Sequence, residues 1–193
     1  MVRTVVMYII LDHSGSMVGQ EIGAANDIAA NLTQQFQSES QTYPEINAKL
    51  RILGFGTELK MLADKSPDTF IWEDVNGNGL TNIGSAFIYL NKTIKSDDDN
   101  ILILISDGGF TDEYFNALSE LMNNRAFPES HRISISTGGK YDSEQLSFFC
   151  GSMNNVVTID QIDRINNIIS QTFTVCKTNN QKTSMLETSD NWE

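Results

Sequence analysis

The chain has 193 residues, a length that suits one domain with a full hydrophobic core. Its hydrophobic fraction of 40% excludes a largely disordered chain. The formal net charge of −12 argues against nucleic acids and anionic membranes as partners, because both bind basic surfaces. Divalent cations and basic proteins are compatible with this charge.

Apolar runs of strand length alternate with segments of helical periodicity in the first half of the chain. Residues 4–11 predict a buried strand, and residues 18–38 carry an apolar stripe with helical spacing. Residues 48–55 and 59–62 predict a second strand and a short strand paired to it by a hairpin. The first apolar run stops at Asp12 and has no small-residue cleavage site, so we expect a strand there and neither a signal peptide nor a membrane span.

The same alternation continues in the second half. The apolar, β-branched run over residues 101–105 is typical of a central parallel strand covered on both faces. Further helices are expected over residues 84–95, 114–124, from 142 and over 162–173, and further strands over 132–136 and 156–159. The pattern predicts an α/β fold, a doubly wound and mostly parallel sheet with helices on both faces. We expect one domain over residues 1–176 and a flexible polar tail over residues 177–193.

Three separate loops carry hard oxygen ligands. Asp12, Ser14 and Ser16 follow the first strand, Thr81 lies in a glycine-flanked loop before a helix, and Asp107 follows the apolar strand 101–105. In an open α/β sheet, the loops after neighbouring strands converge on one crevice, so we expect these side chains to meet. Oxygen ligands of this kind predict a Mg²⁺ site, and Mn²⁺ takes the same ligands.

The chemistry of these ligands favours binding over catalysis. A site built mainly from neutral hydroxyls leaves the metal able to accept an acidic oxygen from outside. No general base stands at an obvious place beside it. We therefore expect the site to hold an Asp or Glu of another protein, and we expect no enzymatic activity.

The order Asp12-x-Ser14-x-Ser16, Thr81, Asp107-Gly108 resembles the metal-ion-dependent adhesion site (MIDAS) of von Willebrand factor A (VWA) domains. Residues 11–17, 79–86 and 106–112 are similar to the bacterial TerY-type group, which is linked to tellurium resistance and stress operons. The resemblance implies a Rossmann-like sheet of six strands with one antiparallel edge strand. It implies Asp12, Ser14, Ser16, Thr81 and Asp107 as ligands of Mg²⁺ or Mn²⁺, and metal-bridged protein binding. Leu80 departs from the group, which often has a second glycine there.

Several other polar residues have two interpretations. Asp112 and Glu113 complement the dipole of the helix that they open, or they lie near the metal as outer acids. The run 97–99 is expected as a solvated loop, with a second cation site as the alternative. Neither His13 nor His131 is assigned a catalytic role. Cys150 is expected in the core.

Two other functions compete with the interaction module. A Mg²⁺-dependent phosphotransferase or phosphatase could use Asp12 as nucleophile. This chemistry usually requires a second acidic residue two positions later, and this chain has Ser14 there. A secreted adhesin would want an export segment and paired cysteines, and Cys150 and Cys176 do not form a disulfide framework. We therefore expect a cytoplasmic interaction module, and the resemblance to the TerY-type group implies a partner from a stress-response or signalling system.

Overall fold

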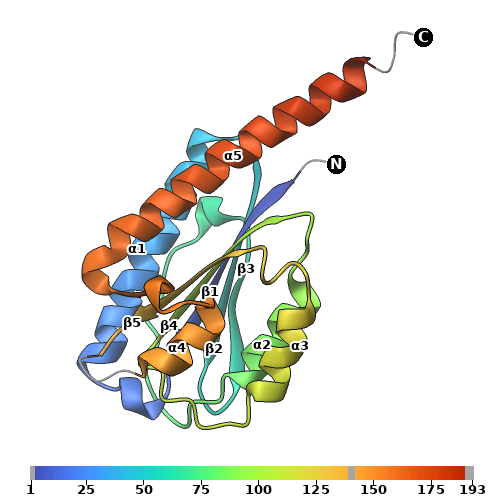
Figure 1. Cartoon of the computed structure of the whole chain (residues 1–193). Coiled ribbons are helices and arrows are strands. Elements are labelled where there is room, and N and C mark those ends of the chain that lie inside the picture. The colour runs from blue at the N-terminus through green and yellow to red at the C-terminus, as the bar shows by residue number, and fades with distance from the viewer. Residues whose placement is uncertain (1–2, 139–141, 190–193) are drawn as a thin grey trace.

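The computed structural model describes residues 3–138 and 142–189, with side chains placed through residue 180. Its six strands form one sheet in the order β3-β2-β1-β4-β5-β6. Among these strands, β2 and β3 pair antiparallel and all other neighbours pair parallel. Helices cover both faces of the sheet (Figure 1). The predicted α/β fold class, with a mostly parallel six-stranded sheet and an antiparallel edge strand, is confirmed.

The elements follow the predicted alternation closely. The strands are β1 (Thr4–Asp12), β2 (Asn47–Phe55), β3 (Leu59–Lys65), β4 (Asp99–Ser106), β5 (His131–Ser136) and β6 (Val156–Thr158). The helices are α1 (Gln20–Thr42), α2 (Gly84–Thr93), α3 (Phe115–Asn123), α4 (Ser143–Cys150) and α5 (Ile162–Ser189). Within the described residues, no helix is both long and apolar enough to cross a membrane.

The core consists of two apolar layers, one on each face of the sheet. Successive residues of a strand point to opposite faces, so Met7 and Ile9 of β1 pack with α1 and α5, while Tyr8 and Ile10 pack with α2, α3 and α4. All four side chains are fully buried. The same alternation along β4 explains why its residues 101–105 are continuously apolar.

The order of the strands places the candidate ligands. The chain runs outward from β1 to β2 and β3, and then returns to β4 on the other side of β1. The strand order therefore reverses between β1 and β4, which pair in parallel over Val5–Leu11. A crevice at the carboxyl ends of these two strands is the usual ligand site of such sheets. Asp12 and Asp107 both lie at this point.

The last helix is longer than predicted. We expected a flexible polar tail from residue 177, but α5 continues to Ser189 and projects beyond the sheet (Figure 1). No Gly or Pro interrupts residues 162–189, and a helix that its first turns already anchor extends at little cost. The helical form of residues 177–189 is thus a correction, while their flexibility stays a prediction. Residues 190–193 lie outside the described part.

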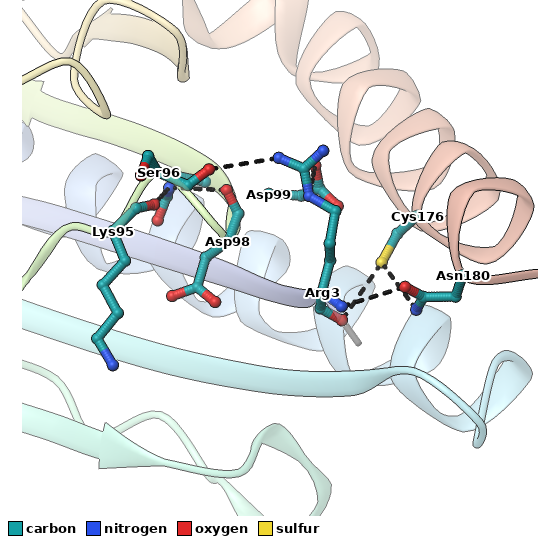
Figure 2. A network of polar contacts seen from close by, with 8 residues as sticks. Arg3, Lys95, Ser96, Asp98, Asp99, Cys176 and Asn180 are labelled. Atoms are coloured by element: carbon teal, nitrogen blue, oxygen red, sulfur yellow. Dashed lines mark hydrogen bonds and ion pairs between the residues drawn. The ribbon is translucent and has the colours of Figure 1, made fainter. Parts of the chain in front are cut away.

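The side chains of Cys176 and Asn180 on α5 contact the backbone of Arg3, just before β1, and hold the helix against the sheet (Figure 2). The Arg3 backbone N–H donates to Asn180 Oδ1 at 3.1 Å, and Cys176 Sγ lies 3.6 Å from the Arg3 carbonyl oxygen. Burial raises the pKa of Cys176 to about 12, so its thiol stays neutral. Arg3 Nε lies 3.4 Å from Asp99 Oδ1. The run 97–99 is therefore not wholly a solvated loop, because Asp99 begins β4 and is paired.

Candidate metal centre

Asp12 is the last residue of β1, and its side chain is fully buried. Its Oδ1 accepts a hydrogen bond from the Ser14 backbone N–H at 2.9 Å. Its Oδ2 accepts one from Ser106 Oγ, at the end of β4, at 2.6 Å. Both oxygens are thus oriented by neighbouring elements of the protein itself.

The charge of Asp12 is not balanced by the chain. Burial raises the pKa of Asp12, the hydrogen bonds from Ser106 and Ser14 oppose this, and the nearby Asp107 raises the pKa further. Among the ion pairs of the described residues, none involves Asp12 or Asp107. A buried carboxylate that is not paired is costly, so a bound cation would relieve this site.

The two serines provide hydroxyl oxygens next to Asp12. Ser14 is fully buried, Ser16 is exposed, and their Oγ atoms lie 3.0 Å apart. This separation is an ordinary hydrogen-bond length. It also equals the spacing of neighbouring oxygens around Mg²⁺, because ligands about 2.1 Å from an octahedral ion lie about 3.0 Å from each other. The two hydroxyls could therefore share one cation with little movement.

Backbone hydrogen bonds join the three predicted loops. The N–H of Gly15 donates to the Gly79 carbonyl at 2.9 Å, which fixes the Thr81 loop to the loop after β1. Thr81 donates from its N–H to Thr111 Oγ1 at 3.1 Å and accepts at its carbonyl from the Thr111 N–H at 2.9 Å. The Thr81 loop is thereby also fixed to the loop after β4.

The conformation and the surroundings of Gly79 explain why glycine precedes Leu80 and Thr81 in this loop. Its φ of +80° is a conformation that side chains rarely adopt, and a Cβ at this position would collide with Thr57. Thr81 itself is 4% exposed. Leu80, the departure from the TerY-type pattern, is 55% exposed and donates its N–H to Thr57 Oγ1 at 3.0 Å.

Asp107 directly follows β4 and is partly exposed. Its Oδ1 accepts from the Gly109 N–H at 3.1 Å, and its carbonyl accepts from the Asp142 N–H at 2.9 Å. The structure thus brings Asp12, Ser14 and Ser16 together and sets Thr81 and Asp107 on loops bonded to the same crevice. The assignment of these five residues as metal ligands stays a prediction.

Sequence reasoning missed two residues that support this arrangement. Ser106 orients Asp12 and also accepts from the Gly108 N–H at 2.9 Å. Its position beside Asp107 was the available signal. Asp112 accepts from the backbone N–H groups of Ile83 and Gly84 at 3.1 Å and 2.7 Å, so it caps α2. We expected Asp112 to complement the dipole of the helix that follows it, or to lie near the metal. A local sequence pattern does not reveal a cap on a helix that begins 28 residues earlier.

His13 lies inside the first loop but points away from the predicted ligand set. It is 5% exposed, and its ring packs over the backbone of Gly54 and Gly56 in and after β2. Burial and then the charge of Lys60 lower the pKa of His13. Within the described residues, His13 Nε2 makes no hydrogen bond.

The donor set determines which metal chemistry is available. Across the described ranges, no group of three or more His, Cys, Asp or Glu side chains could hold a metal ion. A site here must therefore use hydroxyl oxygens beside its two carboxylates. Such a set fits Mg²⁺ or Mn²⁺ and does not fit a metal that needs several nitrogen or sulfur ligands.

The fold is that of VWA domains. No known family model and no curated protein matches the chain. Similar solved structures include a von Willebrand factor type A protein from Catenulispora acidiphila, with 14% identity, a TM-score of 0.62, and coverage of 89% of this chain and 43% of that one. The ArnB paralog VWA2 from Sulfolobus acidocaldarius has 18% identity, a TM-score of 0.61, and coverage of 87% and 44%.

Proximal thread matrix protein 1 from the mussel byssus is similar as well. It has 15% identity, a TM-score of 0.62, and coverage of 88% of this chain and 48% of that one. The chain thus spans less than half of the length of each of these three proteins. At these low identities, the similarity to these three structures shows a shared fold.

Proposed function

We propose that this chain is a non-enzymatic interaction module that binds another protein through a divalent cation. Mg²⁺, with Mn²⁺ as the alternative, would be held by Asp12, Ser14, Ser16, Thr81 and Asp107. The observation that carries this proposal is the fully buried Asp12 carboxylate, which has no cation of the described chain beside it and lies next to the Ser14–Ser16 hydroxyl pair.

The balance of charge explains how such a site would bind a partner. Asp12 and Asp107 offset the two charges of the cation, and the hydroxyls of Ser14, Ser16 and Thr81 add no charge. The bound metal would supply a Lewis acid with affinity for one more anionic oxygen. Asp12 and Ser14 are buried whereas Ser16 is exposed, so the solvent side of the site is the side open to an Asp or Glu of the partner.

The biological setting belongs to the same proposal. The TerY-like stretches at residues 11–17, 79–86 and 106–112 support a role in a bacterial stress-response or tellurium-resistance system. Cys150 and Cys176 are both buried and free, which fits the reducing cytoplasm. The net charge of −12 supports a protein partner over nucleic acid or membrane.

A phosphotransferase or phosphatase that uses Asp12 is the weaker alternative. A nucleophile needs an accessible oxygen, but Asp12 is fully buried and both of its oxygens already accept hydrogen bonds. Hydrolysis of a generic phosphate ester in Mg²⁺ that disappears in Asp12→Asn would favour the enzyme over the interaction module.

The proposal is tested by titrating Mg²⁺ into the metal-stripped full chain by calorimetry. We expect wild type to bind one ion and Asp12→Asn to bind none, while Asp98→Asn, an acid at the opposite end of the sheet, serves as control. A pull-down from host lysate in Mg²⁺ and in EDTA then identifies the partner. Mg²⁺ binding that survives Asp12→Asn would overturn the proposed site, and retention of a partner that ignores metal and mutation would overturn the proposed mechanism.

A further inference from the structure

A cavity of about 300 Å³ lies directly beside the candidate metal centre. It opens between β3 and the irregular segment 75–78, and its lining consists of His13, Lys60, Leu62, Val75, Asn76 and Asn78. His13 stands between Asp12 and Ser14 in sequence. Asn78 precedes Thr81 by three residues and donates its N–H to the His13 carbonyl at 2.7 Å. The cavity and the candidate metal centre therefore lie on the same two loops.

The polar groups of this cavity have unused hydrogen-bonding capacity. His13 is 5% exposed, and its Nε2 has no hydrogen-bond partner in the part of the chain that the structure describes. This nitrogen is closed to solvent, so the hydrogen-bonding groups open to the cavity are those of Lys60, Asn76 and Asn78. Lys60 is exposed and takes part in no ion pair of the described residues.

The charge of the lining indicates what would enter. The cavity presents one ammonium group, Lys60, and no carboxylate, in a chain whose net charge is −12. Glu58 and Asp74 belong to the adjoining segments but are not among the lining residues. Leu62 and Val75 add an apolar wall that can pack a short aliphatic stem. This combination suits an acidic side chain.

We propose that the cavity binds a second carboxylate of the same partner whose first carboxylate binds the metal. Lys60 supplies the counter-charge, and the amides of Asn76 and Asn78 supply hydrogen-bond donors. His13 closes the inner wall of the cavity, where its ring packs against Gly54 and Gly56. The partner is then recognised by two neighbouring acidic side chains. This inference rests on the proposed function and adds the class of partner segment to it.

The test measures the binding of synthetic peptides to the Mg²⁺-loaded full chain by calorimetry and by amide NMR shifts. A reference peptide carries a single Glu between glycines. The other peptides carry two Glu residues that are separated by one, two or three glycines. We expect one spacing to bind about fivefold more tightly than the single-Glu peptide, the upper range for an exposed charge pair. Shifts should extend from Ser16 and Thr81 to Asn76 and Asn78.

Variants locate the added affinity. Lys60→Gln should remove the advantage of the second Glu and leave the single-Glu peptide unchanged. Lys65→Gln, the matched control, loses the same charge on the same strand but lines a different cavity, so it should keep the advantage. Both lysines are exposed, and thermal melts verify that both variants fold.

The outcomes separate this inference from the proposed function. A second Glu that adds no affinity at any spacing, or equal losses in the two lysine variants, would overturn the second carboxylate site alone. Single-Glu binding that is the same in Mg²⁺ and in EDTA would instead overturn the metal-bridged function on which the site rests.

Discussion

The two ends of the sheet treat carboxylates in opposite ways. At the amino ends of the strands, Asp99 of β4 lies beside Arg3, and the Arg3 backbone and Asn180 join β1 to α5. At the carboxyl ends, Asp12 of β1 is more deeply buried, yet it is held by neutral donors and has the negative Asp107 nearby. At the amino ends the carboxylate has a counter-charge from the chain, and at the carboxyl ends the described residues place none beside Asp12.

This difference teaches how a structural polar cluster is distinguished from a binding site. Arg3 Nε and Asp99 Oδ2 make no hydrogen bonds in the described structure, so charge rather than geometry holds that pair. Asp12 has the reverse character, with well-placed hydrogen bonds and no opposite charge. An oriented carboxylate without a counter-charge is what the proposed cation site requires. The predictions below test this contrast, beginning with the largest effect.

Asp12→Asn should abolish Mg²⁺ binding without destabilising the metal-free protein. Burial raises the pKa of Asp12, and a raised carboxyl pKa contributes stability below the unfolded pKa that is lost as pH rises through the folded pKa. Wherever Asp12 is ionised without metal, its buried charge therefore opposes folding, and Asn removes that charge. Calorimetry with Mg²⁺ and thermal melts in EDTA check both parts. A clear fall of the midpoint in EDTA would mean that Asp12 is mainly a structural cap.

Ser106→Ala should weaken both stability and Mg²⁺ affinity. The Ser106 hydroxyl donates to Asp12 Oδ2 and accepts from the Gly108 N–H. Leaving such buried groups without a partner lowers the free energy of unfolding by about 1–3 kcal/mol. Ser134→Ala is the matched control, because Ser134 is equally buried and donates to the Leu146 carbonyl at 2.9 Å, away from Asp12. Urea unfolding and Mg²⁺ titration should show a stability loss in both variants and an affinity loss in Ser106→Ala alone. Equal affinities would show that Ser106 does not position Asp12.

Asp112→Ala should destabilise the protein by about 1–2 kcal/mol, the cost of removing a helix cap. The Ile83 and Gly84 N–H groups at the start of α2 then lose their acceptor, and the adjacent Thr81 loop loosens. A moderate fall in Mg²⁺ affinity should follow. Glu113→Ala removes the same charge from an exposed neighbour and should change neither quantity. The cap would be refuted if both variants unfolded at the same urea concentration.

Arg3→Gln should have the smallest effect, at most about 1 kcal/mol, because the Arg3 side chain is 39% exposed and solvent screens the pair. Its Mg²⁺ affinity should equal that of wild type. Adding Asp99→Asn should recover part of the stability, since the carboxylate that Arg3 neutralises is then gone. An altered Mg²⁺ affinity in Arg3→Gln would contradict the independence of the two ends.

Local patterns predicted the parts of the molecule that depend on local physics. The apolar run at 101–105 marked the central strand because it is buried on both faces, and the spacing of Asp12, Ser14 and Ser16 marked one loop. Long-range roles were not predictable in this way. Asp112 caps a helix that precedes it, and His13 meets Lys60 only because β3 folds back on β2. The length of α5 was missed because residues 177–189 show no apolar stripe, although nothing in them breaks a helix.

The bonds that join the three loops at the candidate centre also have a consequence for the timing of assembly. Hydrogen bonds join residues 13–15 to residues 78–79, more than sixty positions later in the chain. Others join Thr81 to Thr111, thirty positions later. A growing chain therefore has no complete centre until Thr111 has been synthesised and β4 has inserted beside β1. Metal and partner would then select the fully assembled sheet, and a saturating cation at 100 times its dissociation constant would stabilise that state by about 2.7 kcal/mol.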